Sequence, residues 1–391
     1  MGQTIVVGGS IVGSSLAYHM AVAGHASDVV VVEPDPSYEF AAAPRSAGGI
    51  RLMYSLPENI EMSRYGLEVF RNFANLTDVD GAPSMFPYRE HGYLFLASGS
   101  RAVGELEFSF EVQCQVGVTN ELMDHAVLAA RFPFFNLSDV DAGLFGPQDG
   151  SIDPHAAVVG LRRKAEQLGV RYVRDRVVGI QKRGHQVTSV TLASGKTLAA
   201  EAVVNAAGAW AAGVCAMVGM DVPVVPLSRP TFYFEAEDEL GTIPLTKDTS
   251  GVMFRPEGGG YATGLTRADA RAGFKWDVDE SEHNDFMEVL WPAIAHRVPS
   301  FERIKLKRSW AGHYAMNRFD GNAIVGPWTG SLENFYVAIG FSGAGLQKGP
   351  AVGRALTELL THGHYQTIDL QRLSYDRLRA GQQLLEVGFK A

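Results

Sequence analysis

The feature that most constrains this chain is a glycine-rich turn between two short apolar segments near its beginning. Residues 4–7 have the composition of a buried strand, and the turn at 8–13 follows directly. The stretch after Gly13 has the length of a helix that ends near Gly24, and residues 28–33 form a second, valine-rich strand. A strand, a helix and a strand in this order predict a parallel βαβ unit, in which the start of the helix presents free backbone N–H groups to the turn.

The turn matches a dinucleotide-binding pattern except at one position. Ser10 stands where a glycine is usual, so the backbone approach to a phosphate is slightly hindered, although the hydroxyl could donate to a phosphate oxygen. Glu33 closes the second strand twenty residues after Gly13, the spacing at which a carboxylate accepts hydrogen bonds from an adenosine ribose. We therefore expect a dinucleotide, NAD or FAD, at this place. The residues predicted to contact it are Gly8, Gly9, Ser10, Ile11, Val12, Gly13, Glu33 and Pro34.

Two later segments of small residues favour a flavin over a nicotinamide. In the first, a strand runs into residues 206–210, where small side chains let a planar ligand lie against the backbone. In the second, residues 340–347 lead into an apolar helix through Leu360. A glycine-rich helix start can receive the flavin edge on which negative charge accumulates during reduction. The candidate residues are Ala206, Ala207, Gly208, Trp210, Gly340, Phe341, Ser342, Gly343, Ala344, Gly345, Leu346 and Gln347.

The middle of the chain predicts a second, β-rich domain that is interleaved with the first. The fold class we expect is α/β (α+β two-domain): a Rossmann-like FAD-binding domain with an interleaved antiparallel-sheet substrate domain. The FAD-binding domain should comprise residues 1–85, 145–217 and 309–391, and the substrate-binding domain residues 86–144 and 218–308. Within them, the patterns predict helices at 101–117, 120–131, 154–168 and 281–296 and strands at 92–97 and 304–314.

Composition excludes several classes of protein. The net charge is -9 and the basic residues are scattered, which argues against a nucleic-acid partner. Cys114 and Cys215 are the only cysteines, and their separation predicts two buried thiols and neither a disulfide framework nor a metal site. Since the chain starts with an apolar strand and has no long uncharged run, we expect a cytoplasmic protein without a transmembrane segment.

With these blocks in order, the sequence resembles the D-amino-acid-oxidase-like superfamily of FAD enzymes. This superfamily includes sarcosine oxidase, glycine oxidase and dimethylglycine dehydrogenase, and the resemblance spans essentially the whole chain. The stretches 290–301, 309–312, 320–322 and 366–370 are most similar to one branch. That branch includes the mitochondrial FAD-dependent oxidoreductase-domain protein, which is associated with the assembly of respiratory complex I.

The resemblance adds further cofactor contacts. The loop 45–49 should pass the pyrophosphate and the flavin ring, and Val177 or Val178 should offer backbone groups to the adenine. Family members that attach flavin covalently use a cysteine where this chain has His313, or a histidine where it has Ser46. We therefore expect non-covalent FAD, with a histidyl link through His313 as the alternative. The residues added in this way are Arg45, Ser46, Ala47, Gly48, Gly49, Val177, Val178 and Gly312.

The resemblance also implies a reaction. A neutral amine or N-substituted amino acid (sarcosine-like, glycine-like or opine-like) would lose a hydride equivalent to flavin, water would hydrolyse the imine, and O2 would reoxidise the flavin to give H2O2. Two alternatives are a dehydrogenase that passes electrons to a quinone or carrier protein, and a flavoprotein that acts mainly as a partner-binding assembly factor. No oligomeric state is predicted.

Five residues are candidates for the catalytic site. Lys275 resembles the lysine that sarcosine oxidases hold near the flavin to assist oxygen reduction, although a solvated loop lysine is the alternative. Arg51 could pair with a substrate carboxylate or face the flavin. Tyr261 matches a substrate-site tyrosine or is a core aromatic residue, and His313 should lie near the ring. Gln347 stands where sarcosine oxidases have a second cationic anchor, which leaves room for a bulkier or less acidic amine.

Overall fold

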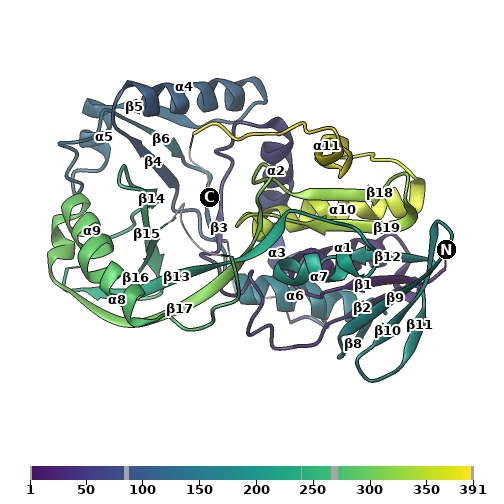
Figure 1. Ribbon diagram of the computed structural model, residues 1–391. Helices are drawn as coiled ribbons and strands as arrows, with labels where there is room; N and C mark the ends of the chain where they lie inside the picture. Colours follow the sequence, from purple (N-terminus) through teal and green to yellow (C-terminus); the bar gives the residue numbers. More distant parts are fainter. Residues whose placement is uncertain (1, 83–87, 239, 266–271, 389–391) are drawn as a thin grey trace.

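The computed structural model describes residues 2–82, 88–238, 240–265 and 272–388, and two large sheets stand at opposite sides of the molecule (Figure 1). The six-stranded sheet has the order β18-β19-β12-β1-β2-β8. β1 pairs in parallel with β2 and β12, and β12 in parallel with β19, so the predicted βαβ opening is confirmed. The bounds are β1 Thr4–Val7, β2 Val29–Val32, β8 Arg171–Val173, β12 Ala202–Asn205, β18 Ile324–Trp328 and β19 Leu332–Ile339.

Helices cover one face of this sheet, and a small β-meander with the short helix α7 covers the other. α1 is buried along eleven of its twelve residues because it packs between α6 and α10. α6 begins as predicted: the Asp153 carboxylate accepts a hydrogen bond of 2.8 Å from the Ala156 N–H, and Pro154 occupies the first turn. The helices of this half are α1 Ile11–Val22, α2 Pro57–Arg71, α3 Phe73–Leu76, α6 Pro154–Gln167, α7 Ala211–Ala216, α10 Gly345–His362 and α11 Asp376–Arg379.

The eight-stranded sheet has the order β17-β13-β16-β15-β14-β4-β6-β5. Its pairs are antiparallel except that β14 runs parallel to β4. The long strands β13 and β17 reach from this sheet toward the six-stranded half (Figure 1). The bounds are β4 Tyr93–Ala97, β5 Glu121–Asp124, β6 Ala142–Gly146, β13 Val224–Ala236, β14 Leu245–Lys247, β15 Val252–Glu257, β16 Gly260–Leu265 and β17 Ile304–Asn317.

The expected class, a Rossmann-like domain with an interleaved antiparallel-sheet domain, is confirmed. Strand β17 crosses the predicted boundary at residue 308, and the division into domains stays a prediction. Two smaller sheets complete the fold: a meander of β9 Val177–Arg183, β10 Gln186–Leu192 and β11 Thr197–Ala199, and the pair β3 Gly49–Ile50 and β7 Gly150–Ser151. The other helices are α4 Ser100–Gln115, α5 His125–Arg131, α8 Glu280–Asp285 and α9 Trp291–Arg297.

Two expectations from the sequence are wrong. The helix predicted for 120–131 is divided, because Glu121–Asp124 pairs with β6 at the sheet edge and the Asp124 carboxylate caps α5 by accepting from the Val127 N–H. Cys114 is exposed, because α4 directs its neighbour Gln113 into the interior, whereas Cys215 is buried. Within the described residues, no helix is long and apolar enough to cross a membrane.

Candidate cofactor and substrate site

Backbone contacts leave no room for a side chain at Gly8 or at Gly13, the two ends of the turn at 8–13. A Cβ on Gly13 would lie 1.9 Å from the carbonyl oxygen of Gly8, and a Cβ on Gly8 would lie 2.7 Å from that of Ala206. Gly8 also has a φ of +97°, in the left-handed region. These contacts bring β1, α1 and β12 together around one small space.

The start of α1 has unsatisfied polar groups that face the turn. Ser10 precedes the helix without forming a side-chain cap, and its buried Oγ has no hydrogen-bond partner among the described residues. A phosphate group would accept hydrogen bonds from this hydroxyl and from the free N–H groups of the helix start. The glycine turn and the unpaired hydroxyl therefore fit the pyrophosphate of a dinucleotide.

Glu33 lies beside the same turn, just after β2. Its Oε2 accepts from the Gly9 N–H at 2.8 Å and its Oε1 from the Asp35 N–H at 2.9 Å. Burial raises the pKa of this carboxyl group, and the two backbone N–H groups act in the opposite direction. The carboxylate is therefore fixed at the edge of the turn, where the sequence predicted contact with a ribose. Val177, at the start of β9, is buried, whereas Val178 is exposed.

The start of α10 forms a second glycine-lined site. A Cβ on Gly343, which has a φ of +98°, would lie 2.6 Å from the ring of Tyr314. Ser342 has a φ of +49°, and its N–H donates to the carbonyl oxygen of Ala315 at 3.0 Å. No side chain caps the helix at Ala344. The positive end of α10 is therefore open to the cavity that Gly343 and Ala344 line.

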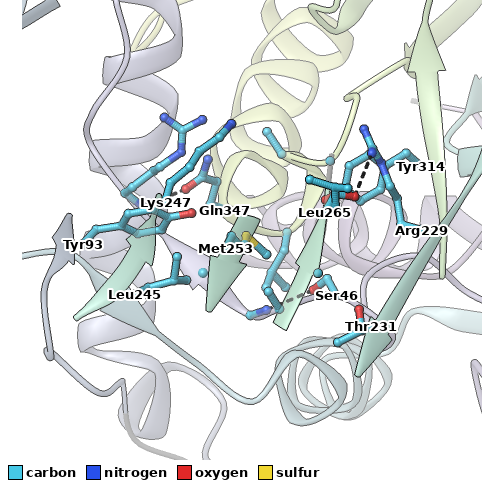
Figure 2. Close-up of a pocket in the computed structure, with 18 of the residues that line it drawn as sticks. Ser46, Tyr93, Arg229, Thr231, Leu245, Lys247, Met253, Leu265, Tyr314 and Gln347 are labelled. Atoms are coloured by element: carbon cyan, nitrogen blue, oxygen red, sulfur yellow. Dashed lines mark hydrogen bonds between the residues drawn. The ribbon is translucent and has the colours of Figure 1, made fainter. Parts of the chain in front are cut away.

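This cavity lies between the start of α10, the loop at 46–49 and one face of the eight-stranded sheet (Figure 2). Its lining is rich in cations and phenols, and none of its described lining residues is acidic. The charged, phenolic and amide side chains that line it are Arg51, Tyr54, Tyr93, Arg229, Lys247, Tyr314 and Gln347.

The predicted flavin loop forms one wall of the cavity. Ser46, Ala47, Gly48 and Gly49 line it. Arg45 is directed away and holds the loop to β17, since its Nη1 donates to the carbonyl oxygen of Ala311 at 2.7 Å. A Cβ on Gly312 would lie 3.1 Å from the Cβ of Arg45, so glycine lets the two segments pass closely.

Arg51 and Gln347 meet at the floor of the cavity. The Arg51 N–H donates to Gln347 Oε1 at 2.8 Å, and the Arg51 guanidinium lies 4.0 Å from the centre of the Tyr54 ring. Gln347 Nε2 donates to the Tyr54 hydroxyl. The segment that follows the predicted flavin loop is thus joined to the first turn of α10 by hydrogen bonds through the Gln347 side chain.

A second layer of polar groups lies beneath that floor. Lys348 Nζ donates to Asn59 Oδ1 at 2.7 Å and lies 4.4 Å from the centre of the Tyr54 ring. Asn59 Nδ2 in turn donates to Glu386, whose other oxygen accepts from the Ser55 N–H at 2.7 Å. Burial lowers the pKa of Lys348 to about 7, with Glu386 opposing that shift. The segment after α11 therefore supports the floor of the cavity.

Several of the predicted site residues do not line the cavity, and Tyr261, Lys275 and Trp210 are among them. Tyr261 packs in the core of the eight-stranded sheet, 4.7 Å from the centre of the Phe301 ring. Lys275 Nζ lies 2.6 Å from Asp279 and 2.9 Å from Glu282. Trp210 is 45% exposed and stacks outside the cavity with neighbouring aromatic rings. The catalytic or cofactor roles assigned to these residues stay predictions.

His313 is also absent from the described lining, although it is buried beside the loop that contains Arg45. Its Nε2 accepts from the Lys275 N–H at 2.8 Å, and its Nδ1 has no described partner. Burial, followed by the charge of Arg45, lowers the pKa of the imidazole. The ring is therefore held neutral, with its orientation fixed by the backbone of residue 275.

Sequence reasoning missed Arg229, Lys247 and Tyr314. Burial, followed by the charges of Arg51 and Arg229, lowers the pKa of Lys247 to about 7. Burial also lowers the pKa of Arg229, whose Cζ lies 5.0 Å from the centre of the Tyr314 ring. The only signal in the sequence was a basic residue within a β-rich segment, which applies to Arg229 and Lys247.

Comparisons with known proteins agree with this geometry. The family model described as "FAD dependent oxidoreductase" (DAO) matches residues 3–359. The chain is 35% identical to FAD-dependent oxidoreductase domain-containing protein 1 of Xenopus laevis, over 98% of this chain and 84% of that protein. It is 26% identical to human mitochondrial dimethylglycine dehydrogenase, over 96% of this chain and 44% of that protein. The crystal structure of L-proline dehydrogenase from P. horikoshii has the same fold, with a TM-score of 0.87, 24% identity and coverage of 98% of this chain and 99% of that one.

Proposed function

The chain belongs to the DAO family of FAD-dependent oxidoreductases, and from that membership we propose that it oxidises a C–N bond in an amine or N-substituted amino acid. FAD is its cofactor, as the sequence predicts, and when bound it accepts a hydride equivalent from a carbon next to nitrogen. The relative named for dimethylglycine supports this substrate class. The observation that carries the proposal is the cavity, where Arg51 and Lys247 face the open start of α10.

The side chains of this chain bind and orient the substrate. Arg51 and Lys247 attract its carboxylate, while Gln347 and Tyr54 shape the floor beneath it. The same two cations lower the pKa of a bound ammonium group, so the substrate loses a proton to solvent and binds as the neutral amine. Loss of hydride from the adjacent carbon would turn the C–N bond of the neutral amine into an iminium, and water would hydrolyse the iminium to a carbonyl compound and a protonated amine. This sequence needs no dedicated general base.

The first turn of α10 stabilises the charge that the reaction generates. Its N–H groups have no side-chain cap at Ala344, and the helix is 18 residues long, so its positive end faces the cavity unopposed. Negative charge that develops beside this end is stabilised without any movement of the protein.

We propose that O2 takes up the electrons and gives H2O2. A second candidate, transfer to a quinone or carrier protein, is favoured by the position of Lys275. Its ammonium is paired with Asp279 and Glu282 outside the described cavity lining, so it does not supply an unpaired cation beside the reaction centre. Oxygen consumption with the substrate in the presence and absence of an artificial acceptor distinguishes the two. Turnover that requires the acceptor would refute the oxidase proposal.

We also propose that FAD is held without a covalent bond. Ser46 stands where some family members have a histidine, and His313 Nε2 is occupied by the backbone N–H of Lys275. Acid precipitation of the purified protein should release all yellow colour into the supernatant. A yellow pellet would indicate a covalent link, and loss of that colour in His313→Ala would assign the link to this residue.

Anaerobic bleaching tests the proposed reaction. The holoenzyme is mixed without oxygen with N-alkyl amino acids, D-amino acids and opines, and absorbance is followed at about 450 nm, where oxidised flavin absorbs. We expect bleaching with a secondary amino acid, and a substrate dissociation constant at least tenfold higher in Arg51→Met. Arg308→Met is the matched control, because this arginine lies on β17 over the ring of Tyr233 and outside the described lining. If no amine bleaches the flavin, the proposed C–N oxidation is refuted.

A further inference from the structure

The sheet wall of the cavity carries cations at both of its ends. Lys247 on β14 is the cross-strand partner of Met253 on β15, and Met253 is the partner of Gly264 on β16. Thr231 on β13 continues this row, because the next residue along the strand pairs with the residue before Gly264. All four line the cavity. Arg229 precedes Thr231 by two positions and therefore faces the same side of the sheet.

Two strands separate the ends of this row. Strands β16 and β15 lie between β13 and β14, so at a spacing of roughly 4.8 Å per strand the backbones of Thr231 and Lys247 are about 14 Å apart, and Arg229 stands two positions further along β13. In Figure 2, Lys247 lies with Tyr93 and Gln347, whereas Arg229 lies with Tyr314 on the other side of the cavity.

Arg51 belongs to the Lys247 end. Its Cζ lies 5.2 Å from the centre of the Phe95 ring, and Phe95 is the cross-strand partner of Lys247. The cavity therefore has one end with two cations and another end with one.

The space between the two ends is apolar and partly open. Met253 and Leu265 line it, and Gly264 contributes no side chain, since a Cβ there would lie 3.1 Å from the Pro230 carbonyl oxygen. A small apolar chain fits this middle section, while a charged group placed there would lose its water without gaining a partner.

The isolated end also has unused hydrogen-bonding capacity. The buried Nε of Arg229 has no partner among the described residues, and its Nη1 makes only a long contact of 3.4 Å to the Leu265 carbonyl oxygen. The Tyr314 ring beside it offers a face to the guanidinium and a hydroxyl at its edge. A carboxylate accepts hydrogen bonds from both a guanidinium and a phenol, and its charge complements that of the guanidinium.

We propose that the substrate is an amine that carries two carboxylates, one bound by Arg51 and Lys247 and the other by Arg229 and Tyr314. This inference rests on the proposed function, because it names the substrate class of the same site. A monocarboxylic amino acid bound by Arg51 and Lys247 leaves the Arg229 guanidinium without a counter-charge among the described residues of the lining.

Inert ligands test the two-ended site without turnover. The probes are diglycolate and its longer homologue 3-(carboxymethoxy)propanoate, which have an ether oxygen where a substrate has nitrogen, and the monoamide of each. Their dissociation constants are measured on the holoenzyme by calorimetry. We expect at least one diacid to bind at least tenfold more tightly than its monoamide. In Arg229→Met that ratio should fall to within about twofold of unity, whereas Arg308→Met should keep it.

The outcomes separate this inference from the proposed reaction. Equal affinity for diacids and monoamides in the unmodified protein, or a tenfold preference that survives in Arg229→Met, would overturn the two-carboxylate site. Neither result bears on the proposed C–N oxidation, which is tested separately by bleaching of the flavin with amines. Conversely, a diacid preference that depends on Arg229 supports the two-ended site even if no amine bleaches the flavin. Far-UV circular dichroism of Arg229→Met identifies a folding defect, in which case the more conservative Arg229→Lys, which shortens the reach, replaces it.

Discussion

Replacing Gly8 by alanine should weaken FAD binding through one steric contact, and Gly24 provides the matched control. Both glycines have positive φ angles, +97° and +88°, so an alanine at either position costs about 1–2 kcal/mol of backbone strain. At Gly24 the new Cβ meets nothing within 4 Å. At Gly8 it would lie 2.7 Å from the Ala206 carbonyl oxygen, 0.7 Å inside the 3.4 Å at which ordinary contact begins.

The overlap at Gly8 can be relieved only if the turn moves away from β12. A shift of that size misplaces the N–H groups that would hold the pyrophosphate, and the loss of two net hydrogen bonds amounts to about 2 kcal/mol, or roughly thirtyfold in the FAD dissociation constant. The assay is quenching of flavin fluorescence on titration into the apoprotein, together with urea unfolding. We expect both variants to lose stability without FAD, Gly8→Ala at least as much as Gly24→Ala because of the added overlap, and only Gly8→Ala to lose FAD affinity. Equal FAD affinities in the two variants would refute the steric argument.

Three further predictions concern charged groups. With Lys247 at a pKa of about 7, the affinity for a carboxylate ligand should fall as pH rises from 6 to 8, and Lys247→Met should remove this dependence in calorimetric titrations. Arg297 is fully buried and bound to Asp248 at 2.5 Å, so Arg297→Met should lower the free energy of unfolding by about 3–5 kcal/mol in urea; a loss below 1 kcal/mol would contradict this. Burial lowers the pKa of His19 to about 4, so stability should be full above pH 6.5 and decrease by about 3 kcal/mol as pH falls to 4. His19→Gln should flatten that decrease in unfolding curves measured across the same range.

The sequence predicted the nucleotide-binding half well because its signals are local. At Gly13 a close backbone contact requires glycine, and this requirement is visible at a single position of the sequence. Strand β2 is buried on both faces, and its run of valines indicates this directly. The same holds at the start of α10, where Gly343 is required by the ring of Tyr314. Such positions could be located without knowing which strands are neighbours.

The substrate end was not predictable in the same way, because it depends on the order of strands. Arg229 and Lys247 lie eighteen positions apart in sequence, and only the placement of β16 and β15 between their strands makes them the two ends of one cavity. Lys275, the lysine that the family resemblance predicts to lie near the flavin, instead pairs with Asp279, four positions further along the chain. The sequence alone does not distinguish a loop lysine near acidic residues from a strand lysine that faces a cavity, because the difference depends on the order of the strands.

Some motifs that carry the family resemblance have structural roles. Arg297 binds Asp139 and Asp248 in the interior, and Asp320 binds Arg377 at 2.8 Å. These residues hold segments of the fold together at a distance from the cavity. They consequently identify the family and carry little information about the substrate.

The six-stranded sheet joins the two ends of the chain, and this has a consequence during synthesis. β1 leaves the ribosome before β19 and α10, and the predicted flavin-binding turn between β19 and α10 is not complete until these elements have emerged. A nascent chain can form the predicted phosphate-binding turn early, but the cavity beside α10 cannot form before the segment from β19 to α10 has been synthesised. Cofactor capture in the cell should therefore be a late event, and FAD shortage should lead to accumulation of full-length apoprotein, not of stalled fragments.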